Sequence, residues 1–235
     1  IAGAGTTAPN LDLTNWVEVG PTNKWAMFDI YRNSPSVFNT ATTVVLAPGS
    51  RVDSIAIMGA RVSDVSVSIE HDGEVIYTYS APMQARLVVD YYDYFYADFN
   101  YKNSVLMLSI PPVLNPIITI TTSQQGSISS IVIGRQTYIG MTRTGHTNDA
   151  LNFSVIDRDI YGTTTLVPRR NIPRTSQEIV VHKKDVNDVL AIRNALRASP
   201  AVWSGLDDDK EDYFEALLIL GIYKEMTISL DYPEY

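Results

Sequence analysis

A run of aromatic residues between positions 91 and 101 carries the side chains best suited to bind a ligand. Its members are Tyr91, Tyr92, Tyr94, Phe95, Tyr96, Phe99 and Tyr101, interleaved with Asp90, Asp93, Asp98 and Asn100. Tyrosine rings stack on the apolar face of a pyranose at low entropic cost, while carboxylates and amides bind its hydroxyls. Tyrosine enrichment is equally expected in a protein–protein interface. A third interpretation also stays open, in which alternate rings fill a sandwich core.

Catalytic patterns are missing from the sequence. It contains no Gly-x-Ser-x-Gly elbow, no His-Glu-x-x-His, no glycine-rich phosphate loop and no cysteine nucleophile. His71, His146 and His182 are scattered, and we expect each at the surface. A carboxylate pair for glycoside hydrolysis is defined by its separation in space, so the sequence leaves that chemistry open. The expectation is a protein that is not an enzyme.

A second cluster that could bind a partner is basic. Arg169, Arg170 and Arg174 lie beside two prolines, in a chain whose 26 acidic residues outnumber its 18 basic ones. The sequence pI of about 4.8 argues against a groove for duplex nucleic acid. We therefore expect these arginines to contact an acidic protein neighbour.

Composition narrows the class of protein further. The absence of cysteine excludes disulfides and thiolate metal sites, and it suits assembly in a reducing cytoplasm. Apolar stretches are interrupted within about ten residues, too short to span a bilayer, so we expect no membrane insertion. The chain opens with Ile1, which suggests a fragment of a longer or processed product.

From about residue 42 to residue 140 the sequence has the pattern of a β domain. Short strands are expected at 43–46, 52–58, 65–69, 75–77, 105–110, 117–121 and 128–133, separated by turn residues. Asp72-Gly73 between two of them predicts a tight hairpin. Many short strands with regular turns favour a sandwich or jelly roll.

The pattern changes after Gly140, which predicts a smaller α+β domain over residues 141–235. A helix is expected over 185–198, with Asp185 as N-cap and Val186, Val189, Leu190 and Leu196 on one face. Residues 213–220 fit a helix or a short buried strand. Alternation of Met226, Ile228 and Leu230 predicts a closing strand over 225–230.

One segment resembles a known family. Residues 15–29 combine Trp16, a Gly20-Pro21 turn and the run Trp25-Ala26-Met27-Phe28, which we expect to anchor the first strand or entry loop in the core. Similar Gly-Pro-Thr-Asn-(Arg/Lys)-Trp-x-Met-Phe-Asp segments open a β-sandwich in virion proteins of tailed bacteriophages that are often labelled carbohydrate-binding. For Trp16 itself, core packing and an exposed sugar-stacking platform both stay open.

The resemblance implies a galactose-binding-like jelly roll over 21–140, preceded at 1–20 by the tail of an upstream module or a linker. The C-terminal part also resembles phage tail proteins, at Gly162 with its following strand, at residues 200–205 and at 221–223. Asp29 begins a loop similar to one that binds calcium in some galactose-binding-like domains, although Ile30 stands where a glycine would help the turn. The acidic run 207–209 lacks EF-hand spacing and is expected to be a solvated turn or a helix start.

Together these observations predict a mainly β, non-enzymatic structural component of a phage tail or baseplate. Its expected partners are other virion proteins in a multimer, with a host-surface glycan as a further candidate, and its expected location is the virion. It would need no cofactor, apart from the calcium that the Asp29 loop suggests. The alternative is a glycan-binding module of a larger cell-surface or hydrolytic protein.

Overall fold

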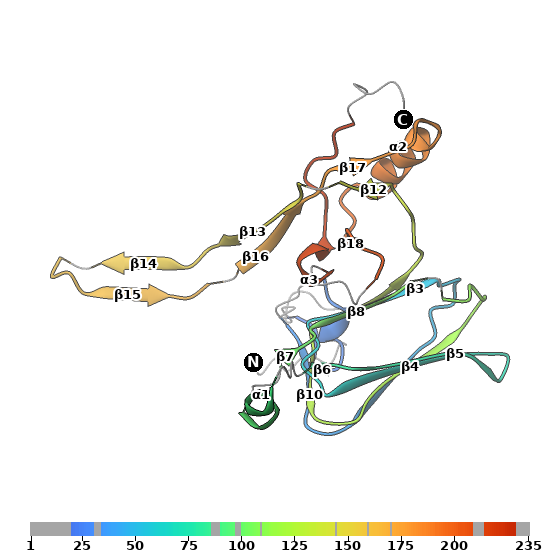
Figure 1. Ribbon diagram of the computed structural model, residues 1–235, viewed down its shortest axis with the longest axis horizontal. Helices are drawn as coiled ribbons and strands as arrows, with labels where there is room; N and C mark the ends of the chain where they lie inside the picture. Colours follow the sequence, from blue (N-terminus) through green and yellow to red (C-terminus); the bar gives the residue numbers. More distant parts are fainter. Residues whose placement is uncertain are drawn as a thin grey trace, which may run out of the picture.

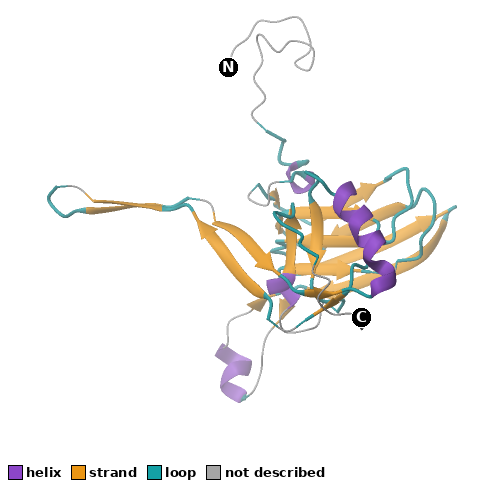
Figure 2. Cartoon of the chain, turned by 90° about the horizontal axis from the view of Figure 1, so that it is seen from above, coloured by secondary structure: helices purple, strands orange, loops and turns teal. Residues whose placement is uncertain are grey.

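The computed structural model describes residues 20–30, 34–85, 90–96, 100–108, 110–143, 145–158, 160–169, 171–208 and 214–228. Within them the chain is mainly β, and its paired strands run antiparallel, so the predicted class is confirmed at this level. Two sheets face each other, further elements pack on one of them, and a long two-stranded ribbon projects from the body (Figures 1 and 2).

The larger sheet has four strands in the order β2-β9-β4-β5. Their bounds are Thr42–Leu46 for β2, Ile117–Thr122 for β9, Asp64–His71 for β4 and Glu74–Pro82 for β5. In β4 the residues Val65, Val67 and Ile69 are buried, and the serines between them are only half-buried. The two-residue alternation of apolar and polar residues therefore gives this sheet one face in the core and one face in contact with solvent.

The predicted hairpin at Asp72-Gly73 is confirmed. His71 pairs with Glu74, which leaves Asp72 and Gly73 as the two turn residues. Both have positive φ, 51° and 84°. A turn of this kind matches the twist of its flanking strands, and aspartate and glycine adopt it at low cost.

The smaller sheet has three strands in the order β11-β3-β8. They span Ser130–Gly134, Ser54–Met58 and Ser104–Met107. Two short pairs lie beside the sheets: β1 (Ser36–Phe38) with β10 (Gly126–Ile128), and β6 (Gln84–Ala85) with β7 (Asn100–Tyr101).

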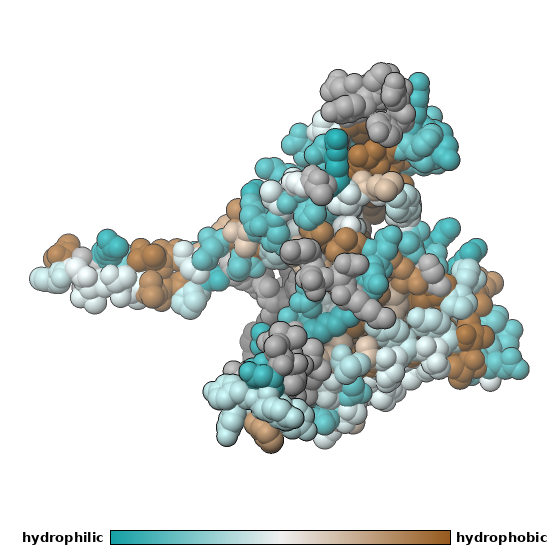
Figure 3. Space-filling model, viewed as in Figure 1, coloured by the Kyte–Doolittle hydropathy of each residue, from teal (hydrophilic) through white to brown (hydrophobic). Residues whose placement is uncertain are grey.

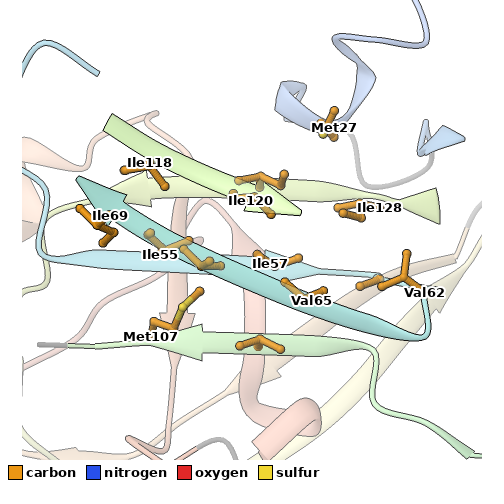
Figure 4. Packing of buried hydrophobic residues seen from close by; sticks show 14 of the residues in the cluster. Met27, Ile55, Ile57, Val62, Val65, Ile69, Met107, Ile118, Ile120 and Ile128 are labelled. Atoms are coloured by element: carbon orange, nitrogen blue, oxygen red, sulfur yellow. The ribbon is translucent and has the colours of Figure 1, made fainter. Parts of the chain in front are cut away.

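The main core lies between the two sheets (Figure 4). Ile55 and Ile57 of β3 meet Val65 and Ile69 of β4, together with Ile118 and Ile120 of β9. Each fully buried aliphatic side chain of this kind stabilises the fold by about 1.5–3 kcal/mol. This shared core is the main force that holds the two layers together.

The entry segment differs from its prediction. Residues Ala26–Phe28 form a 3-10 turn, η2, whose Met27 is buried in the core, whereas Trp25 is 56% exposed. Lys24 Nζ lies over the Trp25 ring, 5.3 Å from its centroid. The turn puts Met27 inward and leaves Trp25 outside the core, with its ring centroid 6.0 Å from that of Phe28.

Beyond residue 140 the elements are shorter. β12 (Met141–Thr142) pairs with β17 (Ile179–Val180), and between them runs the ribbon of β13 (Thr147–Asn152), β14 (Val155–Arg158), β15 (Thr164–Val167) and β16 (Asn171–Ser176). After it come η3 (Lys183–Asp185), α2 (Val186–Ala195), β18 (Ala201–Ser204), α3 (Phe214–Leu217) and β19 (Leu218–Gly221), with β18 paired to β19.

Three predictions for this half have clear outcomes. The helix expected over 185–198 is confirmed as α2, which ends at Ala195 and buries Val189, but Asp185 ends η3 and its side chain makes no capping hydrogen bond. The ambiguous stretch 213–220 is both a helical turn and a strand, α3 followed by β19. The closing strand is wrong for residues 225–228, which have no strand structure, while 229 and 230 lie outside the described part.

The C-terminal elements pack on the body. Ala56 of β3 lies opposite Val132 and Leu106, so these three share the sheet face turned away from the main core. Val132 and Leu106 join Met58, Phe214 and Leu218 in a second buried cluster. The division predicted near residue 140 stays a prediction, and this cluster draws its residues from both sides of it.

Candidate functional site

The aromatic run forms a short exposed helix, α1 (Tyr91–Tyr96). Asp90 caps it, because its Oδ1 accepts a hydrogen bond from the backbone N–H of Asp93 at 2.8 Å. Every aromatic ring of the helix is exposed, from 59% at Tyr94 to 84% at Tyr91. These rings are Tyr91, Tyr92, Tyr94, Phe95 and Tyr96, which we call the α1 patch.

The rings of the α1 patch contact one another. The Tyr92 and Tyr96 centroids are 5.0 Å apart, and those of Tyr94 and Phe95 are 5.1 Å apart in an edge-on arrangement. The interpretation that these five rings fill a sandwich core is wrong, because all five are exposed. Tyr101 belongs to β7 by its backbone pairing with Gln84, while the Tyr101 side chain and Phe99 lie outside the described part. The glycan and interface roles remain.

A pocket of about 430 Å³ lies between β5, β8 and two later loops. It is lined by residues of the edge strands β5 and β8 and by two later loops: Tyr77, Tyr79, Leu106, Met107, Leu108, Gln136, Asp207 and Asp208. Aromatic rings beside an amide and two carboxylates are the groups that bind a sugar ring and its hydroxyls. The predicted solvated turn at 207–208 thus contributes carboxylates to this pocket.

A second hollow, of about 300 Å³, lies on the solvent-facing side of the four-stranded sheet. Its walls are mostly hydroxyl groups of Ser66, Ser68, Thr78, Ser80, Thr119 and Thr121. Ser66 and Ser80 Oγ atoms are 3.1 Å apart across the β4–β5 pair. These hydroxyl side chains occupy the solvent-facing positions of strands whose residues alternate between core and solvent. Cross-strand hydroxyl pairs of this kind stabilise the sheet.

The ribbon, residues 147–176, has almost no core of its own. It projects from the body as two antiparallel hairpin segments, β13–β16 and then β14–β15 (Figure 1). Large apolar side chains are exposed along it, including Ile156 at 61%, Leu166 at 70%, Ile160 at 91% and Tyr161 at 86%. Brown, hydrophobic areas are visible on the projecting arm in Figure 3.

The predicted basic cluster lies at the ribbon, with different surroundings for each arginine. Arg174 of β16 donates through Nε to Asp149 Oδ1 of β13 at 2.8 Å, and its Nη2 donates to Oδ2. This pair lowers the pKa of Asp149 and raises that of Arg174. The side chain of Arg169 is exposed, and its backbone N–H donates to Ser154 Oγ at 3.0 Å. Arg170 lies outside the described part, and the interface role of the three arginines stays a prediction.

The other candidate residues are Trp16, the Asp29 loop and the three histidines. Trp16 lies outside the described residues. Asp29 is half-buried, and the loop predicted to bind calcium includes residues 31–33, also outside them. Across the described ranges, no group of three or more His, Asp or Glu is placed to hold a metal ion. His146 and His182 are exposed and His71 half-buried; His182 accepts a hydrogen bond from Lys184 N–H at the start of η3.

Two features were missed from the sequence. The ribbon carries a recognisable signal, because Gly162 separates two runs rich in β-branched residues, at 155–156 and 164–167. The pocket carries none, since its lining comes from four segments that are far apart in the chain.

Comparison with protein-family models, with curated proteins and with solved structures gave no match. Among the residues that the structure describes, no helix is long and apolar enough to cross a bilayer.

Proposed function

We propose that this chain is a non-enzymatic structural component of a tailed-phage tail or baseplate. In this proposal residues 21–140 form a jelly roll, residues 141–235 form a smaller α+β domain, and the chain works as one copy in a multimer of virion proteins. The antiparallel sheets that face each other, and the crossover order β2-β9-β4-β5, are in keeping with a jelly roll.

The observation that carries the proposal is the ribbon. A two-stranded hairpin alone in water is marginally stable, and it requires packing against another surface for independent stability. Here the outer segment β14–β15 has every residue exposed, including Val155, Ile156, Leu166 and Val167. Exposed apolar areas of this kind mark protein–protein contacts. In an assembled particle, neighbouring proteins would bury the apolar side chains of the ribbon.

The test is the composition of purified particles. Particles of the phage that encodes the chain are separated on a density gradient, and the copies of this chain per particle are counted by quantitative mass spectrometry. A fixed number of several copies supports the proposal. A chain that stays in the cleared lysate while the particles are complete without it overturns the proposal.

Contact with a host-surface glycan is a second candidate, supported by the pocket between the edge strands. Gln136 lies at its wall beside Tyr77 and Asp208, and the backbone of Gln136, not its side chain, donates to Asp53 Oδ1. Gln136→Ala therefore removes a sugar-binding group and keeps that backbone contact. Gln125→Ala, at an exposed position away from the pocket, is the matched control.

The glycan test uses an array of bacterial surface polysaccharides. We expect binding by the unaltered chain and by Gln125→Ala, and a loss of at least tenfold for Gln136→Ala. No binding by the unaltered chain removes the glycan role. Equal binding by the unaltered chain and both variants removes this pocket as the glycan site.

A further inference from the structure

We propose that the pocket between β5 and β8 binds an amino sugar, a pyranose that carries a positively charged amino group. This inference rests on the proposed contact with a host-surface glycan, and it names the class of sugar. The pocket volume of about 430 Å³ lies within the range of small-molecule sites, about 300–1,000 Å³. The strands supply its aromatic and aliphatic side chains, and the later loops supply its amide and its carboxylates.

Two tyrosines form the aromatic part of the pocket. Tyr77 and Tyr79 lie two positions apart on β5, so both rings are on the same face of the sheet. Tyr79 lies opposite the buried Val67 of β4, which identifies this as the core face. β5 is an edge strand, where both rings are only half-buried and line the pocket. A sugar ring can stack on such rings, and their faces also attract a cation.

Two aspartates form the acidic part of the pocket. Asp207 and Asp208 are exposed and lie in its lining. Of the described residues that line the pocket, none is lysine, arginine or histidine, so its charged groups are all negative. An ammonium group donates charge-assisted hydrogen bonds to carboxylates, and these are roughly twice as strong as bonds between neutral groups. The aromatic and acidic parts therefore both favour a cationic ligand.

The same lining disfavours acidic sugars. The carboxylate of a uronic or sialic acid would meet Asp207 and Asp208 with no basic residue among the described lining groups to offset them. Like charges placed together in this way exclude a ligand. The net charge of −8 on the chain repels polyanions at longer range as well. A neutral sugar gains the stacking on tyrosine without the charge attraction, so it ranks between the two.

Isothermal titration of the full chain tests this ranking. The probes are tetraglucosamine, its fully N-acetylated form and tetragalacturonate, in slightly acidic buffer that keeps the amines protonated. We expect tetraglucosamine to bind at least tenfold more tightly than the N-acetylated form, and tetragalacturonate to give no binding. Equal affinity for the first two probes, or no binding of tetraglucosamine, overturns the inference.

A pair of charge-neutralising substitutions locates the binding. Asp207→Asn combined with Asp208→Asn keeps the size of both side chains and removes both charges, and it should weaken tetraglucosamine binding at least tenfold. Asp157→Asn combined with Asp188→Asn changes the net charge equally at exposed positions outside the pocket lining, so it should bind like the unaltered chain. Equal affinities for the two double variants contradict a site at this pocket.

Tetralysine distinguishes a sugar site from a site for a basic peptide. It carries four side-chain amines but no pyranose to stack on Tyr77 and Tyr79, so we expect it to bind at least fivefold more weakly than tetraglucosamine. Equal or tighter binding overturns the assignment to a sugar. Binding of neutral polysaccharides on the array, together with failure of these tests, would overturn this inference alone. The structural function is decided separately by the copies counted in particles.

Discussion

Glu215 Oε1 accepts a hydrogen bond at 3.0 Å from the backbone N–H of Ser104, which lies 111 residues earlier in the chain. The same carboxylate accepts from the backbone N–H of Asn103, just before β8 begins. Two backbone donors at the start of an edge strand are thereby satisfied by a side chain of α3. This carboxylate and the neighbouring Phe214 attach the C-terminal elements to the smaller sheet.

Phe214→Ala tests that attachment. Phe214 is 1% exposed and packs with Met58 and Leu218, so its truncation leaves a cavity between α3 and the sheet. We expect a loss of about 3–5 kcal/mol in the free energy of unfolding, measured with urea. Phe95→Ala, whose ring is 67% exposed, is the matched control and should change it by less than about 0.5 kcal/mol. Similar losses for both variants would contradict the buried role of Phe214.

Asp64→Asn tests a pH-dependent contribution to stability. Hydrogen bonds from Ser123 and from Ser63, the latter at 2.7 Å, lower the pKa of the Asp64 carboxyl. The folded-state pKa therefore lies below the unfolded value of about 3.9, so the stabilisation is present above that value and is lost as pH falls through the folded-state pKa.

Urea midpoints at pH 7, 4 and 2.5 give the measurement. Asp64→Asn should be less stable than the unaltered chain at pH 7, and this difference should shrink toward pH 2.5. Asp157→Asn, on the exposed ribbon, is the control and should show little difference at any pH. A deficit of Asp64→Asn that stays constant down to pH 2.5 would speak against the carboxylate as its cause.

Gly140→Ala tests a close backbone approach at the beginning of the C-terminal half. A Cβ at Gly140 would lie 2.5 Å from the carbonyl oxygen of Val180 and 2.7 Å from Ile179 Cγ2, so β17 would have to move. We expect faster hydrogen exchange in β12 and β17 and a lower melting temperature. Gly134→Ala, with open space at its Cβ, should leave both unchanged. Equal hydrogen exchange and equal melting temperatures for the two variants would mean that β17 moves away from the added Cβ without loss of stability.

Much of the β architecture was predictable because its signals are local. Alternation in β4 and the Asp72-Gly73 turn each specify their structure within a few residues, and both are present. The same alternation misled at residues 225–228, where Met226 and Ile228 alternate without a strand, since pairing depends on a partner that alternation alone does not reveal.

The candidate sites were predictable only in part. Clustering of tyrosines in sequence was enough to mark α1 as a candidate surface, because the rings come from one helix, but the choice between exposure and burial required the structure. The pocket beside Tyr77 and Gln136 depends on how the edges of two sheets meet, which no short segment encodes. Trp25 was predicted to lie in the core because its side chain is large and apolar. The η2 turn instead buries Met27 and leaves Trp25 exposed.

The most direct test of the account is to shorten the ribbon and count copies in particles. Replacing residues 149–174 by Asn-Gly joins Asn148 to Thr175, an opposed pair in β13–β16, through a two-residue hairpin turn. The control replaces Asp72-Gly73 by Asn-Gly, which preserves the β4–β5 turn. We expect both variants to fold, with the circular dichroism of a β protein, and only the shortened ribbon to lower incorporation into purified particles, by at least tenfold. Particles that retain the shortened chain at the copy number of the unaltered chain would contradict it.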